Sequence, residues 1–491
     1  MLFDTAILST SVATSSVAEA FALPEISFQV VISSLPADQN PLALLLSKTV
    51  ASVVAAPPLI AAIPSALSAP ADQPELAPAT PQLASVTVGP TVRLSAARLS
   101  SLTGMGLLDQ LALLPADDLA TFTSEHADAV TKLIASQPGA KQVSAWWSGL
   151  DATARSELMT GSPSLVGNLE GVPFGLRDVA NRRYLDTTIT ALQTVRGEGR
   201  SELLDAQHQL HMLTQVQDAL ISPAGSPDRY LLTVDPAGNG TAAIVIGDLA
   251  TADYVSYLIP GMFYTVDGQM VPWTSAAQSY YDTQKAWIAR LGEVDPSLSD
   301  ATVATVAWLG YQTPSMVNFT SLDLAYQGSA AITTAVNGLR ELRGADQPFL
   351  SLIAHSYGST AAMMALSDNG IVIDALAVVG SPGSSARSAA ELGVAGDNVY
   401  VGEAAWDQVK DSAFFGTDPG STAFGAHAFS VDGGTDPITG APLIGSTGHN
   451  EYFVAGSESM RNLALIGLGR GQLITTDSGS SPAAKGVSGL H

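Results

Sequence analysis

Short apolar runs alternate with helical stretches through the second half of the chain, and this alternation constrains the fold more than any other feature. The apolar runs, rich in β-branched residues, are Tyr230–Val234, Ala242–Ile246, Val255–Ile259, Val303–Trp308, Phe349–Ala354, Ala375–Val379, Val399–Gly402 and Ala428–Val431. Helical patterns lie near Ala276–Arg290, Ser329–Leu342, Gly358–Ser367 and Ser457–Leu468. Alternating strands and helices form a mostly parallel sheet with helices on both faces. Residues 229–474 are therefore predicted to form one α/β domain.

The preceding residues divide into two segments of different composition. Residues 1–92 are low in complexity and hold a single basic residue, Lys48. From Ala51 to Pro90 they are dominated by Ala, Pro, Ser, Val and Leu, which predicts a linker because proline cannot continue a helix. Residues 93–228 are instead predicted to form a helical region. At the other end, residues 475–491 are rich in Ser and Gly and are expected to form a flexible tail.

Apolar side chains at helical spacing support the helical region. One stripe lies behind a cap expected at Asp117 or Asp118, and a second runs through Ser201–Leu220. The first stripe consists of Leu119, Phe122, His126, Val130 and Leu133. His126 is interpreted as a core or boundary residue of that helix.

A leader-like window lies inside the N-terminal segment. Lys48 precedes the apolar run Thr49–Pro64, and small residues follow at Ser65–Ala69, a spacing that suits signal-peptide cleavage. This pattern favours secretion or a cell-envelope location over the cytoplasm, and a plain Ala/Pro linker is the alternative. Because Pro57 and Pro64 interrupt the run, no stable membrane span is expected.

Charge and residue types exclude several classes of function. The chain has 45 acidic and 21 basic residues, a net charge of −24, and so lacks the basic clusters that bind nucleic acid. It has no cysteine, which excludes disulfides, thiolate catalysis and Cys-ligated metals. Phosphate-binding loops and metal motifs do not stand out, so neither a cofactor nor a metal is expected. Nothing in the sequence indicates the oligomeric state.

The clearest motif is Ala354-His355-Ser356-Tyr357-Gly358, between an apolar run and a helix of small residues. A serine in such a tight strand–turn–helix is typical of a nucleophile elbow, which needs small residues two positions before and after it. Gly358 meets this need, and alanine at position 354 is the next smallest choice after glycine. Ser356 is the predicted nucleophile, and a turn with a capping serine is the alternative. His355 is interpreted as structural.

A serine hydroxyl requires a base, and the base requires an acid that orients it. In this arrangement the acid and then the histidine follow the serine along the chain. His427, His449 and His491 are the histidines that follow Ser356. We prefer His449 because its loop lies between the last predicted strand and the final helix.

The acid should follow the predicted strand Val399–Gly402. The candidates there are Glu403, Asp407 and Asp411. Asp407 is preferred because its distance from the strand suits an acid loop, while Glu403, next to the strand, is the main alternative.

Backbone N–H groups near the elbow are candidates for an oxyanion hole, which stabilises developing negative charge. We assign these donors to Tyr357 and to Met262, in the segment Pro260-Gly261-Met262-Phe263. A plain Pro-Gly turn is the alternative for that segment. Aromatic residues that flank these loops are predicted to bind an apolar substrate, or else to pack beneath the site: Phe263, Tyr264, Trp406 and Tyr452.

The motifs together resemble an actinobacterial α/β-hydrolase family long catalogued only as a domain of unknown function. Besides the elbow, the resemblance is carried by residues 167–173 and 177–182, Pro260-Gly261, Gly380-Ser381-Pro382-Gly383, residues 402–409 and Gly448-His449-x-x-Tyr452. It covers about residues 145–470 and implies an α/β-hydrolase core with Ser356, Asp407 and His449 as its triad. The sequence departs from the family pattern at Ala354 and Glu170, where Gly and Asp are usual.

The segment from Asn168 to Arg182 has two interpretations. It is either a polar staple between the helical region and the core, which we prefer, or part of the active-site rim.

These features predict a serine hydrolase that cleaves carboxylic esters of uncharged or apolar acyl groups, in small molecules or lipids, through an acyl-enzyme. An acyltransferase with the same triad is one alternative. The other is a non-catalytic α/β-hydrolase fold that serves as an interaction module of the cell envelope.

Overall fold

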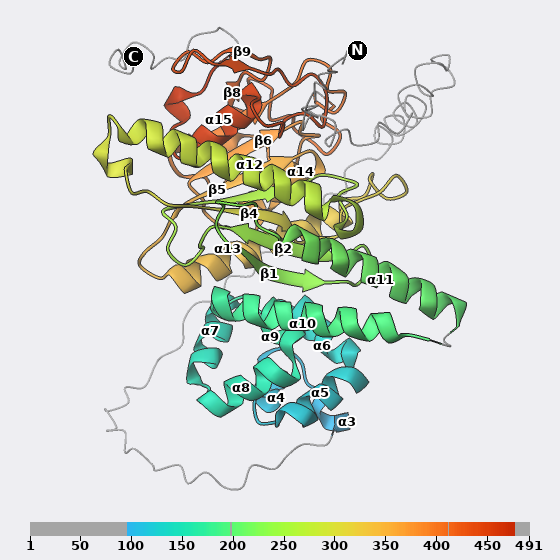
Figure 1. Cartoon of the computed structure of the whole chain (residues 1–491). Coiled ribbons are helices and arrows are strands. Elements are labelled where there is room, and N and C mark those ends of the chain that lie inside the picture. The colour runs from blue at the N-terminus through green and yellow to red at the C-terminus, as the bar shows by residue number, and fades with distance from the viewer. Residues whose placement is uncertain (1–95, 197–198, 411, 477–491) are drawn as a thin grey trace, which may run out of the picture. The chain divides into compact units, whose positions relative to one another are not determined.

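A mostly parallel sheet lies at the centre of residues 229–474 (Figure 1). The computed structural model describes residues 96–196, 199–410 and 412–476, all within the second of two units of the chain, Gly89–His491. The spatial order in the sheet is β1-β2-β4-β3-β5-β6-β7-β8. Its strands are β1 (Arg229–Asp235), β2 (Thr241–Ile246), β3 (Tyr254–Ile259), β4 (Val303–Leu309), β5 (Phe349–His355), β6 (Ala375–Val379), β7 (Val399–Gly402) and β8 (His427–Phe429).

Strand direction divides the sheet into two parts. The pairs β1–β2 and β2–β4 are antiparallel, whereas every pair from β4 through β3, β5, β6 and β7 to β8 is parallel. All residues of β4 and β6 are buried, which explains why their sequences are continuous apolar runs. Each predicted strand is present with bounds shifted by two residues or fewer, and the predicted fold class is confirmed.

Helices cover both faces of the sheet (Figure 1). One apolar core joins the sheet to α11 (Arg200–Ala219), α12 (Val266–Gly292) and α15 (Glu458–Gly467), and a second joins it to α13 (Asp323–Arg343) and α14 (Tyr357–Asp368). Helix α12 begins ten residues before the predicted start. Thr265 caps it by accepting from the Gly268 N–H at 3.2 Å, and Pro272, a residue typical of helix boundaries, lies inside it.

Short helices of the helical region form a third apolar core. They are α3 (Ala96–Leu99), α4 (Gly104–Leu111), α5 (Ala116–Glu125), α6 (Ala127–Ala135), α7 (Ala140–Gly149), α8 (Ala152–Gly161) and α9 (Pro163–Asn168), followed by the longer α10 (Phe174–Thr194). The prediction of one helix through His126 is wrong. His126 separates α5 from α6 with non-helical angles (φ −128°, ψ 42°), and the cap of α5 is Pro115, with Asp117 in its first turn.

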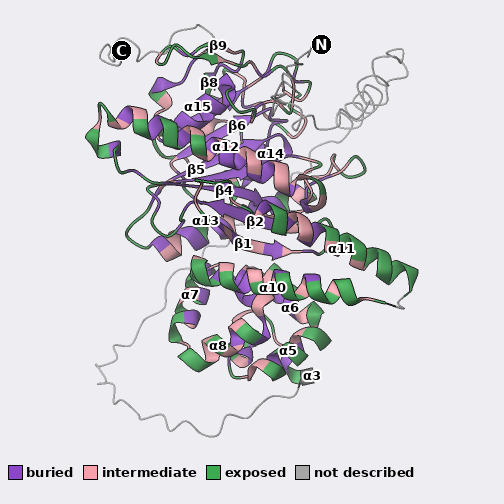
Figure 2. Ribbon diagram, viewed as in Figure 1, coloured by how far each residue is buried: buried purple, intermediate pink, exposed green. Residues whose placement is uncertain are grey.

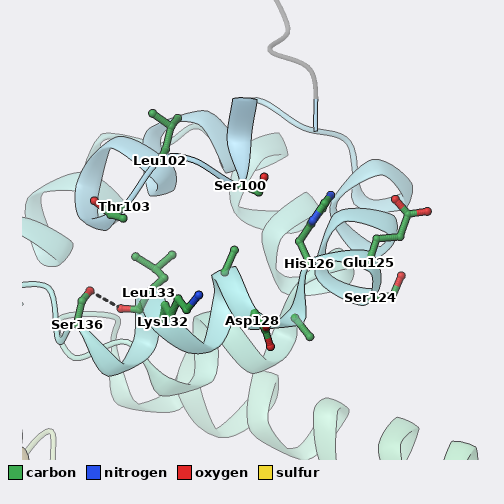
Figure 3. Close-up of a pocket in the computed structure, with 12 residues that line it drawn as sticks. Ser100, Leu102, Thr103, Ser124, Glu125, His126, Asp128, Lys132, Leu133 and Ser136 are labelled. Atoms are coloured by element: carbon green, nitrogen blue, oxygen red, sulfur yellow. Dashed lines mark hydrogen bonds between the residues drawn. The ribbon is translucent and has the colours of Figure 1, made fainter. Parts of the chain in front are cut away.

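A pocket of about 500 Å³ lies beside this break (Figure 3). Polar and charged side chains from the end of α5 and from α6 line much of it, among them Glu125, His126, Asp128 and Lys132. Its lining includes none of the residues predicted to be catalytic.

Side chains from α9 and α10 hydrogen-bond the backbone of the edge strand β1. Asn168 pairs with both the N–H and the C=O of Val234, at 3.0 Å each, as a neighbouring strand would. Asn181, fully buried, donates to the C=O groups of Leu231 and Leu232. The interpretation of residues 168–182 as a staple between the helical region and the core is confirmed.

Burial decreases away from the sheet (Figure 2). The stripe predicted within Ser201–Leu220 consists of Leu203, Leu210, Leu213 and Val216. In α11, Leu213 and Val216 are buried, but Leu203, near the start of the helix, is 40% exposed. Among the described residues, none of the helices is long and apolar enough to cross a membrane. Thr475, assigned to the tail by composition, is buried and bonded to Asn462. The N-terminal segment and leader-like window lie outside the described residues.

Candidate active site

The predicted nucleophile lies on a strained turn between β5 and α14. Ser356 has φ 53° and ψ −132°, a positive φ that L-residues rarely adopt, and is 3% exposed. Neighbouring backbone leaves no room for a side chain at Gly358, where an added Cβ would lie 2.3 Å from the Pro260 carbonyl oxygen. The small residue required after the serine is therefore explained by contact with the loop that follows β3.

Hydrogen bonds join Ser356, His449 and Asp407 in a continuous chain. His449 Nε2 lies 2.8 Å from Ser356 Oγ, and Nδ1 lies 2.9 Å from both carboxylate oxygens of Asp407. The Asp407 side chain is fully buried, whereas the His449 side chain is 24% exposed. In this geometry Nδ1 carries the proton, and Nε2 can accept one from the serine hydroxyl.

Several donors hold the Asp407 carboxylate. Besides His449, the Val409 N–H donates to Oδ1 at 2.8 Å and the Tyr452 O–H donates to Oδ2 at 2.7 Å. Burial acts to raise the pKa of Asp407, but the hydrogen bond and charge of His449, with the other two donors, outweigh it and lower that pKa to about 2. Asp407 is therefore a carboxylate at neutral pH.

Backbone N–H groups beside the serine are candidates to donate hydrogen bonds to a developing oxyanion. An added Cβ on Gly261 would lie 2.5 Å from Ser356 Cβ, so only glycine lets this loop come so close. The Phe263 N–H donates to the Pro314 C=O at 3.0 Å and is therefore occupied, whereas the predicted donor Met262 remains a candidate. Tyr357 begins α14, where N–H groups have no partner within the helix.

The two other described candidates, Glu403 for the acid and His427 for the base, face other parts of the structure. An added Cβ on Gly420 would lie 2.1 Å from a carboxylate oxygen of Glu403, so Glu403 faces that turn. The His427 ring lies 5.5 Å from that of Tyr400, on the edge strand β8. Asp411 and His491 are outside the described residues.

The four aromatic residues predicted to bind substrate have different surroundings. Phe263 is 49% exposed and Trp406 is 81% exposed, so both are available at the surface. Tyr264 packs against the rings of Trp273 and His355. Assignment of Tyr452 to the substrate pocket is wrong, because this side chain is fully buried behind Asp407. Sequence could not show this, since the position of a loop side chain depends on the loops packed around it.

His355, interpreted as structural, contacts the predicted base directly. Its Nε2 lies 2.7 Å from the His449 carbonyl oxygen, and the two rings are 4.7 Å apart. The elbow therefore holds the loop of His449 through the residue that precedes the serine.

A known protein family matches the part of the chain that contains the serine and the acid of this site. Residues 235–417 match the model of a family described as alpha/beta hydrolase, a span that includes Ser356 and Asp407. The chain has an α/β-hydrolase fold. The match and the fold support hydrolase activity.

Relatives among curated proteins are known only as uncharacterized proteins. Two from Mycobacterium tuberculosis strains are 27% identical in an alignment 384 residues long, which covers 69% of this chain and 57% of theirs. A shorter one from Mycobacterium bovis is 26% identical over 48% of this chain and 86% of its own length. The chain thus spans little more than half the length of the first relatives.

Solved structures with similarity to this chain include two hydrolases at 12% identity. An esterase from Pyrobaculum calidifontis matches over 57% of this chain and 97% of its own, with a TM-score of 0.30. The alpha/beta hydrolase LAE6, from the metagenome of Lake Arreo, matches over 59% and 97%, with a TM-score of 0.32.

Proposed function

We propose that this protein is a serine hydrolase that cleaves carboxylic esters with uncharged or apolar acyl groups. The observation that carries the proposal is the unbroken hydrogen-bond chain from Ser356 Oγ through His449 to Asp407, at the tip of a strained elbow. A histidine held between a buried carboxylate and a serine hydroxyl is arranged for proton transfer from that hydroxyl.

The reaction proceeds in two stages through an acyl-enzyme. Ser356 Oγ attacks the ester carbonyl while its proton passes to His449 Nε2, and the imidazolium then protonates the leaving alkoxide. The Met262 and Tyr357 N–H groups stabilise the oxyanion. Water, deprotonated by His449, attacks the acyl-enzyme. As the bond between the acyl group and Ser356 Oγ breaks, the imidazolium returns this proton to Oγ and the carboxylic acid is released. Asp407 stabilises the imidazolium and keeps Nδ1 protonated throughout.

Fluorophosphonate labelling and ester turnover test the nucleophile. We expect the probe to label the wild type on Ser356, and Ser356→Ala to abolish labelling and lower kcat by several orders of magnitude, leaving about 10³–10⁴-fold catalysis over water. Ser385→Ala, at an exposed serine, is the matched control and should retain both. Near-wild-type turnover by folded Ser356→Ala would end the proposal.

A second pair of variants tests the acid. Asp407→Asn should lower kcat by about 10⁴-fold, because an amide favours the wrong imidazole tautomer and cannot stabilise the imidazolium. Glu403→Gln, on the same loop but turned toward Gly420, should remain close to wild type. If Glu403→Gln is the crippled variant, Asp407 is not the acid.

A further inference from the structure

We propose that Tyr452 is a positioning residue that fixes the Asp407 carboxylate against His449 and moderates its negative charge. The inference deepens the proposed function and rests on it. Tyr452 is fully buried and acts through the acid.

The phenol group of Tyr452 has two partners that define its orientation. Its oxygen accepts from the Ala404 N–H at 2.8 Å, and its O–H donates to Asp407 Oδ2 at 2.7 Å. A phenol has a single proton. Because Ala404 offers a donor, that proton must be directed to Asp407, and the side chain is fully buried in this arrangement.

Tyr452 also ties the acid loop to the base loop. It lies three residues after His449, while Ala404 and Asp407 belong to the loop after β7, so a single side chain bridges the two catalytic loops. A second tie, from the Trp406 N–H to the Thr447 C=O at 3.0 Å, holds the loops together without touching the carboxylate. Losing the phenol O–H should therefore disturb the carboxylate more than it disturbs the loops.

The backbone directly after β6 lies close to the Asp407 carboxylate. An added Cβ on Gly380, which has φ 56°, would lie 2.6 Å from Asp407 Oδ2 and 3.0 Å from both the Tyr452 ring and His449 Nδ1. Glycine at this position thus lets the acid, the base and the tyrosine meet at one point.

The charged and titratable groups around Tyr452 keep it a donor. Burial and the charge of Asp407, with a smaller effect from Glu403, raise the pKa of Tyr452 well above its ordinary value. His449 bonds the same carboxylate, and the ring of His355 lies 6.0 Å from that of Tyr452. The phenol is therefore protonated throughout the range in which His449 would work.

Removing the O–H has a consequence that simple loss of packing does not. With one donor fewer, the Asp407 carboxylate holds more negative charge and stabilises the imidazolium of His449 more strongly. The protonated, inactive form of the base then persists to higher pH, while a less firmly held carboxylate orients the imidazole less well.

Tyr452→Phe and Tyr280→Phe form a matched pair for the test. Tyr280 is also fully buried in the same apolar core, but its hydroxyl bonds Ser256 and the Leu463 C=O, away from the triad. For Tyr452→Phe we expect kcat to fall about 10-fold with KM within twofold, and the acid limb of kcat/KM to move up by about half a pH unit. Tyr280→Phe should change thermal stability without moving the limb.

Proton NMR supplies a readout that does not need turnover. The downfield signal of the His449 Nδ1–H, assigned with labelled histidine, should move further downfield in Tyr452→Phe and remain in place in Tyr280→Phe. Should Tyr452→Phe not fold, 3-fluorotyrosine at position 452 keeps the shape, strengthens the O–H donor, and should shift the limb and the signal in the opposite directions.

The outcomes separate this inference from the proposed function. An active wild type whose pH profile and NMR signal are unchanged by Tyr452→Phe would overturn the positioning role and leave the hydrolase intact. A wild type without turnover or probe labelling would instead overturn the hydrolase. In that case the NMR signal still decides whether Tyr452 acts on the Asp407–His449 pair.

Discussion

His355 is a buried titratable side chain that touches the triad without belonging to it. Nε2 bonds the His449 C=O, so in the neutral ring the proton resides there, and no partner of Nδ1 is present among the described residues. Burial and the nearby charge of His449 lower the pKa of His355 to about 3, although its bond to the His449 C=O and the charge of Asp407 act against this. The folded state therefore favours a neutral His355.

This preference predicts acid sensitivity. Between the ordinary pKa of 6.5 and about 3, His355 is protonated in the unfolded chain but neutral in the folded chain. The contribution of this residue to the free energy of unfolding is therefore fully present above pH 6.5 and is lost as pH falls toward 3. His355→Gln should remove this dependence, reducing the difference in unfolding free energy between pH 7 and pH 5 by about 2 kcal/mol. Urea unfolding at both pH values measures it.

His427→Gln, at an exposed residue on β8, is the control and should keep the wild-type difference. An equal difference in wild type and His355→Gln would show that the acid sensitivity originates elsewhere.

At the scale of elements, the helical region covers an edge of the sheet. An edge strand presents unpaired N–H and C=O groups that can recruit another chain. Along β1, the Leu231 N–H donates to Asp178 and both backbone groups of Val234 bond Asn168. The Asn181 amide donates to the C=O groups of Leu231 and Leu232. These side chains complete the backbone bonding that a ninth strand would otherwise supply.

Asn181→Ala should be strongly destabilising. It removes a buried amide that donates to the C=O groups of Leu231 and Leu232, so we expect a loss of about 2–4 kcal/mol in unfolding free energy. The Gly167 C=O also loses this donor but keeps Arg177 Nε–H. Gln193→Ala, at an exposed site on the same helix, should remain within about 0.5 kcal/mol of wild type. A small effect of Asn181→Ala in urea unfolding would mean that water replaces the amide at this edge.

Sequence predicted elements better than it predicted side-chain positions. The apolar runs identified every strand of the sheet because buried strands need continuous apolar residues. The antiparallel pairing of β1 and β2 could not be predicted from the sequence, since strand direction depends on the connections between strands rather than on residue types. The apolar spacing also continued through His126, where the structure has two helices separated by a residue with non-helical angles. The structure brings Ser356, His449 and Asp407 together as expected, but a buried Tyr452 could not be told from a pocket residue by spacing alone.

At the scale of the whole molecule, charge and surface composition bear on the substrate. The net charge of −24 repels anions, and the loops at residues 260–265, 311–322, 403–409 and 446–454 contain neither Lys nor Arg. Large apolar side chains on these loops are exposed: Phe263, Met316, Val317, Trp406 and Val454. Uncharged substrates would gain binding free energy from contact with these side chains and would not be repelled by the negative charge of the protein.

A matched ester series tests this selectivity. We expect kcat/KM for an uncharged ester to exceed, by at least about 10-fold at low salt, that for an analogue with a free carboxylate beside the scissile bond. Added salt should narrow the gap, because at 0.1 M repulsion between charges farther apart than the Debye length of about 10 Å is largely screened. Lengthening an uncharged acyl chain should raise kcat/KM, since each buried CH₂ contributes about 0.8 kcal/mol. A preference for the carboxylate ester that persists at moderate salt would contradict the apolar assignment, because it requires a local cationic partner that these loops do not supply.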